Sequence, residues 1–330
     1  MSAAHPGDAV REVLTLGETM VALRGSGPLK LGGSMDVSIA GAESNVAIGL
    51  ARLGHATRWA GAVGDDEAGE LVLRTLRAEG VDVSGASRDQ DAPTGLILFE
   101  PRLPEVTRVH YYRAGSAGSR LAASAVERAF AAGGAPHVLH LTGITPALGP
   151  AALDAGRRAL ELAKEHGTTV CLDVNFRSRL WSEKEAAGVM RSWIPYVDVL
   201  IASDDELPLC VPETAAAAAG EVSALADGLL AQGVREVVVK LGADGATAYT
   251  AGGELHAPAR PVRAVDAVGA GDAFVAGYLS ALLDEADVAG RLDRAVTTGA
   301  FAVASHGDWE GAPTRAELGL LGAGAGTVVR

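Results

Sequence analysis

The chain has 330 residues, 48% of them hydrophobic, which is enough for one large domain or a large domain with a small appendage. Its net charge of −13, with no cluster of lysines and arginines, argues against nucleic acid or an anionic membrane as a partner. No apolar run approaches the roughly 18 residues that a membrane span requires, and residues 1–11 lack the apolar stretch of a signal peptide, so we expect a cytoplasmic protein.

Strands and helices alternate along most of the chain. The predicted strands cover residues 13–16, 59–63, 137–141, 169–174, 197–201 and 236–240. The predicted helices cover residues 43–53, 67–79, 151–166, 222–232 and 292–305. Glycines at 54, 80 and 167 provide the usual C-terminal stop for three of these helices. Repeated strand–helix units predict an α/β fold with a doubly wound, mostly parallel sheet flanked by helices.

Two segments break this alternation. Residues 29–39 and 94–113 lack helical periodicity and are predicted to be rich in β structure. We expect both to belong to a small β-sheet lid formed by residues 18–40 and 94–118. The remaining ranges, 1–17, 41–93 and 119–330, then form the α/β core. Residues 214–220 are rich in alanine and are predicted to be a helix or a loop.

The two cysteines, Cys171 and Cys210, lie far apart and outside any CxxC or Cys/His spacing. A disulfide framework or a zinc site is therefore not expected. The sequence predicts two ordinary buried thiols.

Residues 265–274, with the sequence VDAVGAGDAF, carry the strongest chemical signal. Gly269, Ala270 and Gly271 precede a predicted helix, so small residues leave its first N–H groups open to an anion. Asp272 in the first turn is placed to accept the proton of an attacking hydroxyl. The alternative is a tight loop followed by a capping carboxylate. Phe274 replaces the third glycine of a dinucleotide-binding motif, and the chain has no Walker A sequence.

Four motifs in order resemble the ribokinase/PfkB family of carbohydrate kinases. They are GAESN at 41–45 with ARLG at 51–54, GAVGDD at 61–66, KLGADG at 240–245 and DAVGAGD at 266–272. The resemblance spans nearly the whole chain. It implies an ATP-dependent kinase with a ribokinase-like fold, a small-molecule acceptor and Mg²⁺ as a cofactor.

The family resemblance also implies roles for individual residues. Gly269, Ala270 and Gly271 would form an anion hole beside Asp272 as the general base. A second set would lie along the nucleotide: Lys240, Leu241, Gly242, Ala243, Asp244 and Gly245. Glu206 would help to hold Mg²⁺ through water and phosphate. The family often has Asn three residues before this Glu, where this chain has Ser203. Without the resemblance, Glu206 would be a solvated carboxylate at a helix start.

Two arginines indicate an anionic acceptor. Arg113 ends a predicted lid strand, with Tyr111 on the same face, and Arg177 follows the predicted strand 169–174. Arginine binds carboxylates in a bidentate manner, and each charge-assisted bond contributes about 1.5–3 kcal/mol. Taken singly, each arginine is more often a surface residue.

Four further segments resemble the 2-keto-3-deoxygluconate kinase branch of the family. They are YYRAGSAGSRL from 111, LHLTGITPAL from 139, DVNFRSRLW from 173 and SHGDWEGAP from 305. This resemblance implies transfer of the ATP γ-phosphate to the 6-hydroxyl of a six-carbon keto acid. It implies substrate contacts from Gly41, Tyr111, Arg113, Arg177, Asp272 and Asp308, and contacts to the nucleotide phosphates from Asn175, Phe176 and Arg177.

Several alternatives stay open. Asp308 is equally explained as a turn residue, and Glu18 and Asn45 either contact the sugar or serve as a loop anchor and a helix-start residue. A kinase of a neutral sugar, such as a fructokinase or ribokinase, is the first rival function. A catalytically silent protein that binds sugar acids is the second. By analogy with relatives, we expect a homo-oligomer formed through the lid.

Overall fold

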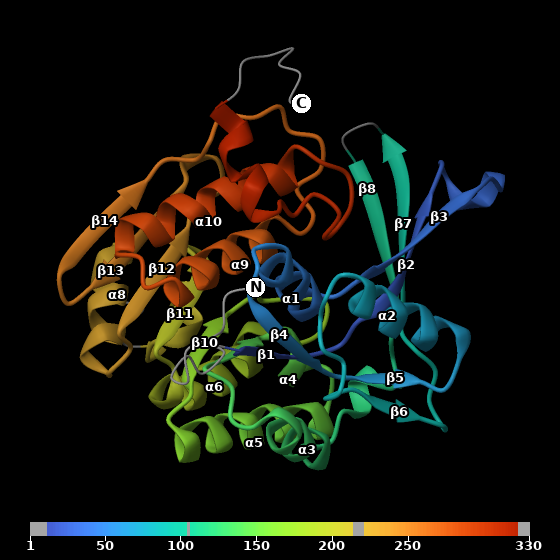
Figure 1. Cartoon of the computed structure of the whole chain (residues 1–330), viewed down its shortest axis with the longest axis horizontal. Helices are drawn as coiled ribbons and strands as arrows, with labels where there is room; N and C mark the ends of the chain where they lie inside the picture. Colours follow the sequence, from blue (N-terminus) through green and yellow to red (C-terminus); the bar gives the residue numbers. More distant parts are fainter. Residues whose placement is uncertain (1–11, 104–105, 214–220, 323–330) are drawn as a thin grey trace, which may run out of the picture.

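The computed structural model describes residues 12–103, 106–213 and 221–322, which form a large helix-covered sheet with a smaller sheet beside it (Figure 1). Among the described residues, the main sheet has eight strands. Their spatial order is β14 (Gly253–Ala257), β13 (Ala246–Thr250), β12 (Glu236–Lys240), β11 (Val199–Ser203), β10 (Thr169–Asp173), β9 (Val138–Thr142), β1 (Glu12–Leu16) and β4 (Ala56–Ala60). The strands from β12 to β4 are parallel, and β13 pairs in an antiparallel manner with both β12 and β14. The predicted α/β fold is confirmed.

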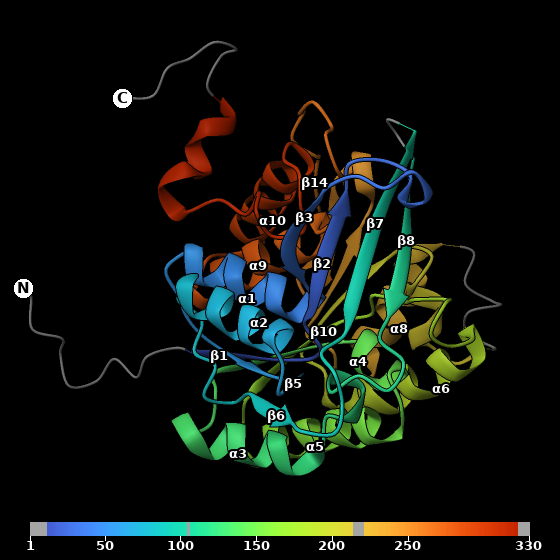
Figure 2. The ribbon, with the colours of Figure 1, turned by 90° about the vertical axis from the view of Figure 1, so that its right-hand side faces the viewer.

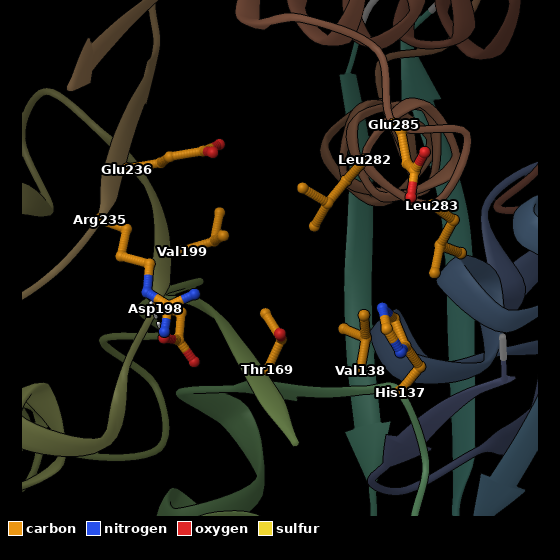
Figure 3. A pocket seen from close by; sticks show the side chains of 10 residues that line it. All are labelled: His137, Val138, Thr169, Asp198, Val199, Arg235, Glu236, Leu282, Leu283 and Glu285. Carbon is orange, nitrogen blue, oxygen red and sulfur yellow. Dashed lines mark ion pairs between the residues drawn. The ribbon is translucent and has the colours of Figure 1, made fainter. Parts of the chain in front are cut away.

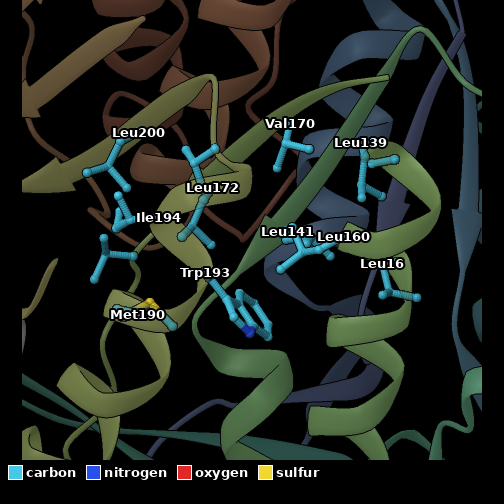
Figure 4. Close-up of a cluster of buried hydrophobic side chains, with 14 of the residues drawn as sticks. Leu16, Leu139, Leu141, Leu160, Val170, Leu172, Met190, Trp193, Ile194 and Leu200 are labelled. Atoms are coloured by element: carbon cyan, nitrogen blue, oxygen red, sulfur yellow. The ribbon is translucent and has the colours of Figure 1, made fainter. Parts of the chain in front are cut away.

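Side chains alternate between the two faces of this sheet. Leu139 and Leu141 of β9 enter one hydrophobic cluster, whereas Val138 enters the other. The first cluster is covered by α3 (Ala123–Gly133), α5 (Pro150–His166), α6 (Glu183–Trp193) and α8 (Val222–Ala231), and Figure 4 shows part of it. The second is covered by α1 (Ala42–Arg52), α9 (Ala270–Leu283) and α10 (Val288–Val303). Burial on both faces is the arrangement that a parallel sheet requires.

Local sequence explains several helix ends. The Asp66 side chain accepts a hydrogen bond from the Gly69 N–H at the start of α2 (Glu67–Ala78). Ser182 and Glu185 form a capping box at the start of α6. The helix α5 ends at Gly167, whose φ of 68° lies in the left-handed region that favours glycine. The predicted helices 67–79 and 151–166 are thereby confirmed.

Other short elements connect these layers. One is the short helix α4 (Ile144–Ala147). Short 3₁₀ helices occur at η1 (Leu29–Leu31), η2 (Gly118–Arg120), η3 (Ile194–Tyr196), η4 (Leu207–Cys210), η5 (Gly242–Asp244) and η6 (Arg315–Gly322).

Two predicted strands and one segment predicted to be rich in β structure differ from the structure. The strand predicted at 59–63 is split at Gly61, and β5 (Ala62–Gly64) pairs with β6 (Ser87–Asp89) in a separate sheet. A Cβ at Gly61 would overlap the Trp59 ring and the Gly17 carbonyl oxygen, so the break falls at a position that has no room for a side chain. The strand predicted at 197–201 begins at Val199, because η3 precedes it.

The third difference lies in residues 29–39, which are only partly β. They contain η1 and most of β3 (Met35–Ala40). Gly32 and Gly33, with φ of 75° and 127°, turn the chain between the two elements.

The two segments that lack helical periodicity contribute to a second sheet, as predicted. Its order is β3, β2 (Met20–Gly25), β7 (Leu96–Leu103) and β8 (Val106–Tyr112), and Figures 1 and 2 show these strands side by side. The buried face of this sheet contains Met20, Ala22, Ala40, Ile97 and Phe99. Val268 of the main body packs against that cluster, so the second sheet contacts the loop that leads into α9.

Both cysteines are free and buried, as predicted, and burial raises the pKa of the Cys210 thiol to about 12. Within the described ranges, no helix has the length and apolar character needed to cross a membrane. The prediction for residues 214–220 falls outside the described residues.

Candidate active site

The carboxyl ends of the central strands and the start of α9 meet at one edge of the main sheet. Asp173 ends β10 and Lys240 ends β12, and the Lys240 amine lies 2.8 Å from a carboxylate oxygen of Asp173. A Cβ on Gly271 would lie 3.7 Å from the same amine. Burial lowers the pKa of Lys240, but the nearby carboxylates, Asp173 foremost, outweigh burial and hold it above its ordinary value. This edge is where α/β proteins bind ligands.

Asp272 lies buried in the first turn of α9. The Asn45 side-chain amide, from the start of α1, donates a 2.8 Å hydrogen bond to its Oδ2. Burial raises the pKa of Asp272 to about 7, and the charge of Asp173 adds to this shift. The hydrogen bond from Asn45 and the charges of Arg177 and Lys240 lower the pKa and so oppose it. A carboxyl group with a pKa near neutrality is matched to accepting and releasing a proton.

The predicted anion hole forms the tip of α9. Gly269 is the N-cap, with a left-handed φ of 73°, and a Cβ there would overlap the Asp308 carbonyl oxygen. Only glycine therefore fits this position without strain. The first N–H groups of a helix have no partner within the helix, so this tip presents donors to an anion.

We predict that Gly269→Ala lowers turnover sharply and destabilises the protein by at least about 1–3 kcal/mol, the cost of a strained left-handed residue. Gly188→Ala is the matched control, because Gly188 is exposed within α6 and a Cβ there meets no atom within 4 Å. That change should be neutral or stabilising by about 0.5–1 kcal/mol. Thermal unfolding and steady-state turnover would check both, and equal behaviour of the two variants would contradict the prediction.

Glu206 joins the loops that follow β10 and β11. Its two carboxylate oxygens accept hydrogen bonds from the Phe176 N–H at 2.6 Å and the Ser203 N–H at 2.9 Å. Asn175, with a positive φ of 41°, is buried beside them and its amide lies 3.5 Å from Asp173. No group of three or more His, Cys, Asp or Glu able to hold a metal occurs in the described parts of the chain. A single anchored carboxylate still fits Mg²⁺, which binds through one or two carboxylates together with water and substrate phosphates.

The remaining predicted nucleotide residues follow Lys240. The turn η5 contains Gly242, Ala243 and Asp244, all exposed, and the Leu241 N–H donates to the Gly245 carbonyl at 2.8 Å. Arg177 is exposed, and it is close enough to Asp272 to lower the pKa of that carboxyl.

Arg113 forms a buried ion pair. Its Nε and Nη2 lie 2.7 and 2.5 Å from Oε2 of Glu18, and the Ser116 hydroxyl donates to the other carboxylate oxygen, Oε1. The guanidinium lies 5.7 Å from the centre of the Tyr111 ring, consistent with their predicted common face. Gly41 adjoins the same loop, because a Cβ there would overlap the Glu18 carbonyl oxygen. These contacts favour the loop-anchor interpretation of Glu18.

Asp308 is paired with an arginine that the sequence analysis missed. Its carboxylate lies 2.5 Å from Nη2 of Arg24 on β2, and Nη1 lies 3.5 Å from Asp266. Burial raises the pKa of Asp308 to about 6, although Arg24 acts in the opposite direction. The sequence analysis likewise predicted no role for Asp173. One feature of the sequence could have indicated Arg24: it is the single charged residue of the run MVALRG at 20–25.

A cavity of about 240 Å³ lies at the opposite edge of the sheet, where β9 to β12 begin (Figure 3). Asp198 on its wall pairs with Arg235 at 3.1 Å, and Glu236 pairs with Arg291 and with the Tyr278 hydroxyl. None of the predicted site residues lines this cavity, so it is separate from the candidate active site.

Known proteins resemble this chain over most of its length. The model of a family described as "pfkB family carbohydrate kinase" matches residues 10–315. The 2-dehydro-3-deoxygluconokinase of Bacillus subtilis (strain 168) is 35% identical over 326 residues, covering 93% of this chain and 94% of that protein. The 2-dehydro-3-deoxygalactonokinase of Haloferax volcanii is 35% identical over 308 residues, covering 90% and 92%. An E. coli structure titled as a ribokinase II in complex with ATP and Mg²⁺ has a TM-score of 0.84 and 25% identity, covering 94% and 98%.

Proposed function

Because the chain belongs to the pfkB family of carbohydrate kinases and is thus an ATP-dependent sugar kinase, we propose that it phosphorylates 2-keto-3-deoxygluconate at the 6-hydroxyl. The observation that carries the proposal is the buried Asp272 carboxylate at the tip of α9, beside Lys240. The names of the 35% identical relatives support a sugar acid as the acceptor.

In the proposed reaction, Asp272 is the general base. Asn45 occupies Oδ2, which leaves Oδ1 for the acceptor hydroxyl. As the hydroxyl oxygen bonds to the γ-phosphorus, its proton passes to Asp272, and the bond from the γ-phosphorus to the β–γ bridging oxygen breaks. ADP leaves with that electron pair, and Asp272 later releases the proton to solvent. Phosphoryl transfer needs little more from the protein than positioning, charge stabilisation and such a base.

The phosphates are held by the tip of α9 and by basic groups. The Ala270 N–H donates to the Ala267 carbonyl at 3.3 Å, so the other N–H groups around Gly269 and Gly271 face the transferred phosphoryl. Lys240 and the turn to Gly245 lie along the nucleotide, and residues 175–177 contact its phosphates. When bound near Glu206 through water, Mg²⁺ neutralises phosphate charge.

At the acceptor end, Arg113 and Arg177 bind the carboxylate, Tyr111 and Gly41 line the sugar, and Asp308 accepts sugar hydroxyls. The second sheet acts as the lid over this site, and copies of the chain associate through it. Its edge strand β8 supports this, because Val106, Tyr111 and Tyr112 are exposed there. Light scattering would show a monomer if the association is wrong.

A coupled ADP-release assay across sugar acids and neutral sugars tests the proposed acceptor. We expect kcat/KM for 2-keto-3-deoxygluconate to exceed that for fructose or ribose by roughly 10- to 100-fold, the effect of one charge-assisted hydrogen bond of about 1.5–3 kcal/mol. Equal use of fructose would contradict an acid-specific site. Binding of the acid without turnover of any acceptor would instead indicate a silent binding protein. The galactonate epimer belongs in the same panel, because it differs at one hydroxyl.

A further inference from the structure

Arg24 joins the second sheet to two loops of the main body. It comes from β2 and pairs with Asp308, 284 positions away, and with Asp266, 242 positions away. Its guanidinium lies 4.1 Å from the centre of the Phe99 ring on β7, and its buried Nε makes no hydrogen bond to the protein. The side chain is thus held by stacking on one side and by two carboxylates on the other.

Asp308 lies near other acidic groups, and Arg24 offsets their effect on its carboxylate. Glu310 and Asp266, both acidic, act against Arg24 and raise the pKa of Asp308. Arg24 is the cation paired with this carboxylate, and its charge is the largest influence that lowers the pKa of Asp308. A buried carboxylate next to other acids is costly without a paired cation.

A second arginine at the same loop has a different role. Arg52 of α1 donates to the backbone carbonyls of Trp309, Glu310 and Ala312, and it pairs with Glu79. It therefore fixes the path of the loop, whereas Arg24 holds the Asp308 side chain. This pair of arginines provides a matched control.

We propose that Arg24 is a positioning residue of the acceptor site, which orients the Asp308 carboxylate toward acceptor hydroxyls and fastens the second sheet to the main body there. The inference rests on the proposed function, because that function places Asp308 at the acceptor. The position has a further consequence, since the Asp308 carbonyl lies directly against Gly269. Movement of Asp308 would also disturb the tip of α9.

The proposal predicts a pH dependence that a purely structural role would not produce. Asp308 accepts hydroxyls in its ionised form, so acceptor binding weakens as the pH falls through its pKa of about 6. Removal of Arg24 raises this pKa further, because Asp266, Glu310 and burial then act unopposed. The weakening should therefore begin at a higher pH in the variant.

The test compares Arg24→Met, which keeps an unbranched chain over Phe99, with Arg24→Lys and Arg52→Met at pH 6.5 and 8.5. For Arg24→Met we expect acceptor KM to rise about tenfold at pH 8.5 and about a hundredfold at pH 6.5, with the KM for ATP nearly unchanged. Arg24→Lys keeps the charge and should restore most of the pH dependence of the wild type. Arg52→Met should lower stability without changing the ratio of the two KM values. An unchanged KM in Arg24→Met, or the same pH shift in Arg52→Met, would overturn the proposal.

Hydrogen–deuterium exchange without substrate separates this inference from the proposed function. Exchange in β2 and residues 306–311 should accelerate in Arg24→Met and in Asp308→Asn, and the double variant should add little to either. Absence of acceptor turnover in the wild type would refute the proposed function. The exchange data would still test whether Arg24 holds Asp308 and fastens the second sheet to the main body. Normal turnover with no change in exchange or KM would refute the positioning role alone. If Arg24→Met fails to fold, Arg24→Lys becomes the decisive variant. A lysine amine cannot contact Asp308 and Asp266 as the guanidinium does, so the acceptor KM should still rise severalfold. An unchanged acceptor KM in Arg24→Lys would contradict the positioning role.

Discussion

Asp272→Asn is expected to lower kcat by at least about a hundredfold, the usual scale for loss of a general base, while ATP and acceptor still bind. The amide keeps the shape of the side chain and can still accept from Asn45, but it cannot take the acceptor proton. Steady-state kinetics and calorimetric binding of ATP would check this. Turnover near that of the wild type would refute the proposed base.

The pH profile gives an independent test of the same residue. The base must be ionised, so kcat/KM should fall as the pH decreases through about 7, the pKa that burial gives Asp272. The hydrogen bond from Asn45 lowers this pKa, so Asn45→Leu should raise it and move the acid side of the kcat/KM profile to higher pH. A profile that is flat between pH 6 and 8 would contradict this assignment.

Stability supplies the control for Asp272→Asn. A carboxyl whose folded pKa is raised binds more protons in the native state, so native stability falls as the pH rises from its unfolded value toward 7. Replacing it with a neutral amide removes this cost. The variant should therefore unfold at pH 8 at a temperature no lower than that of the wild type, which would exclude misfolding as the cause of lost turnover.

Arg113→Ala is expected to cost about 3–5 kcal/mol of unfolding free energy, because it leaves the Glu18 carboxylate buried without its cation. Glu18 is 2% exposed and has the Ser116 hydroxyl as its other side-chain donor. Adding Glu18→Gln to this variant removes the uncompensated charge and should recover most of the loss. Denaturant unfolding of the two variants would measure the difference.

Acceptor affinity separates the two roles of Arg113. The double variant Arg113→Ala/Glu18→Gln should still show a raised acceptor KM with ATP affinity intact. Arg177→Ala offers the comparison, because Arg177 is exposed and should change stability by no more than about 0.5 kcal/mol while also raising acceptor KM. A defect confined to ATP binding in the Arg113 variants would contradict the proposed contact with the acid.

The sequence predicted the features that depend on neighbouring residues. The alternation of strands and helices predicted the α/β fold, because each element shows the hydrophobic periodicity of its type within its own residues. The tip of α9 was visible because Gly269, Ala270, Gly271 and Asp272 are consecutive. The break at Gly61 was not visible, since the run 59–63 is locally suited to a strand, whereas the pairing of β5 with β6 depends on residues distant in the sequence.

The partners of the site residues were beyond the reach of sequence patterns. Lys240 was predicted to lie along the nucleotide, but its ion pair with Asp173 joins residues 67 positions apart and could not be predicted. Arg24 stands in a strand with no motif around it, and its pairing with Asp308 exists only after both sheets are assembled. Such contacts are set by topology and have no local signature.

The hydrogen bond between Asn45 and Asp272 spans 227 positions, which has a consequence for synthesis on the ribosome. At about 5–20 residues per second, roughly 10–45 s separate the emergence of the two partners. Throughout that interval the nascent polypeptide contains the residues of α1, which carries Asn45, but lacks those of α9, which carries Asp272. If Asp272 is the base proposed above, phosphoryl transfer begins only after residue 272 has been made.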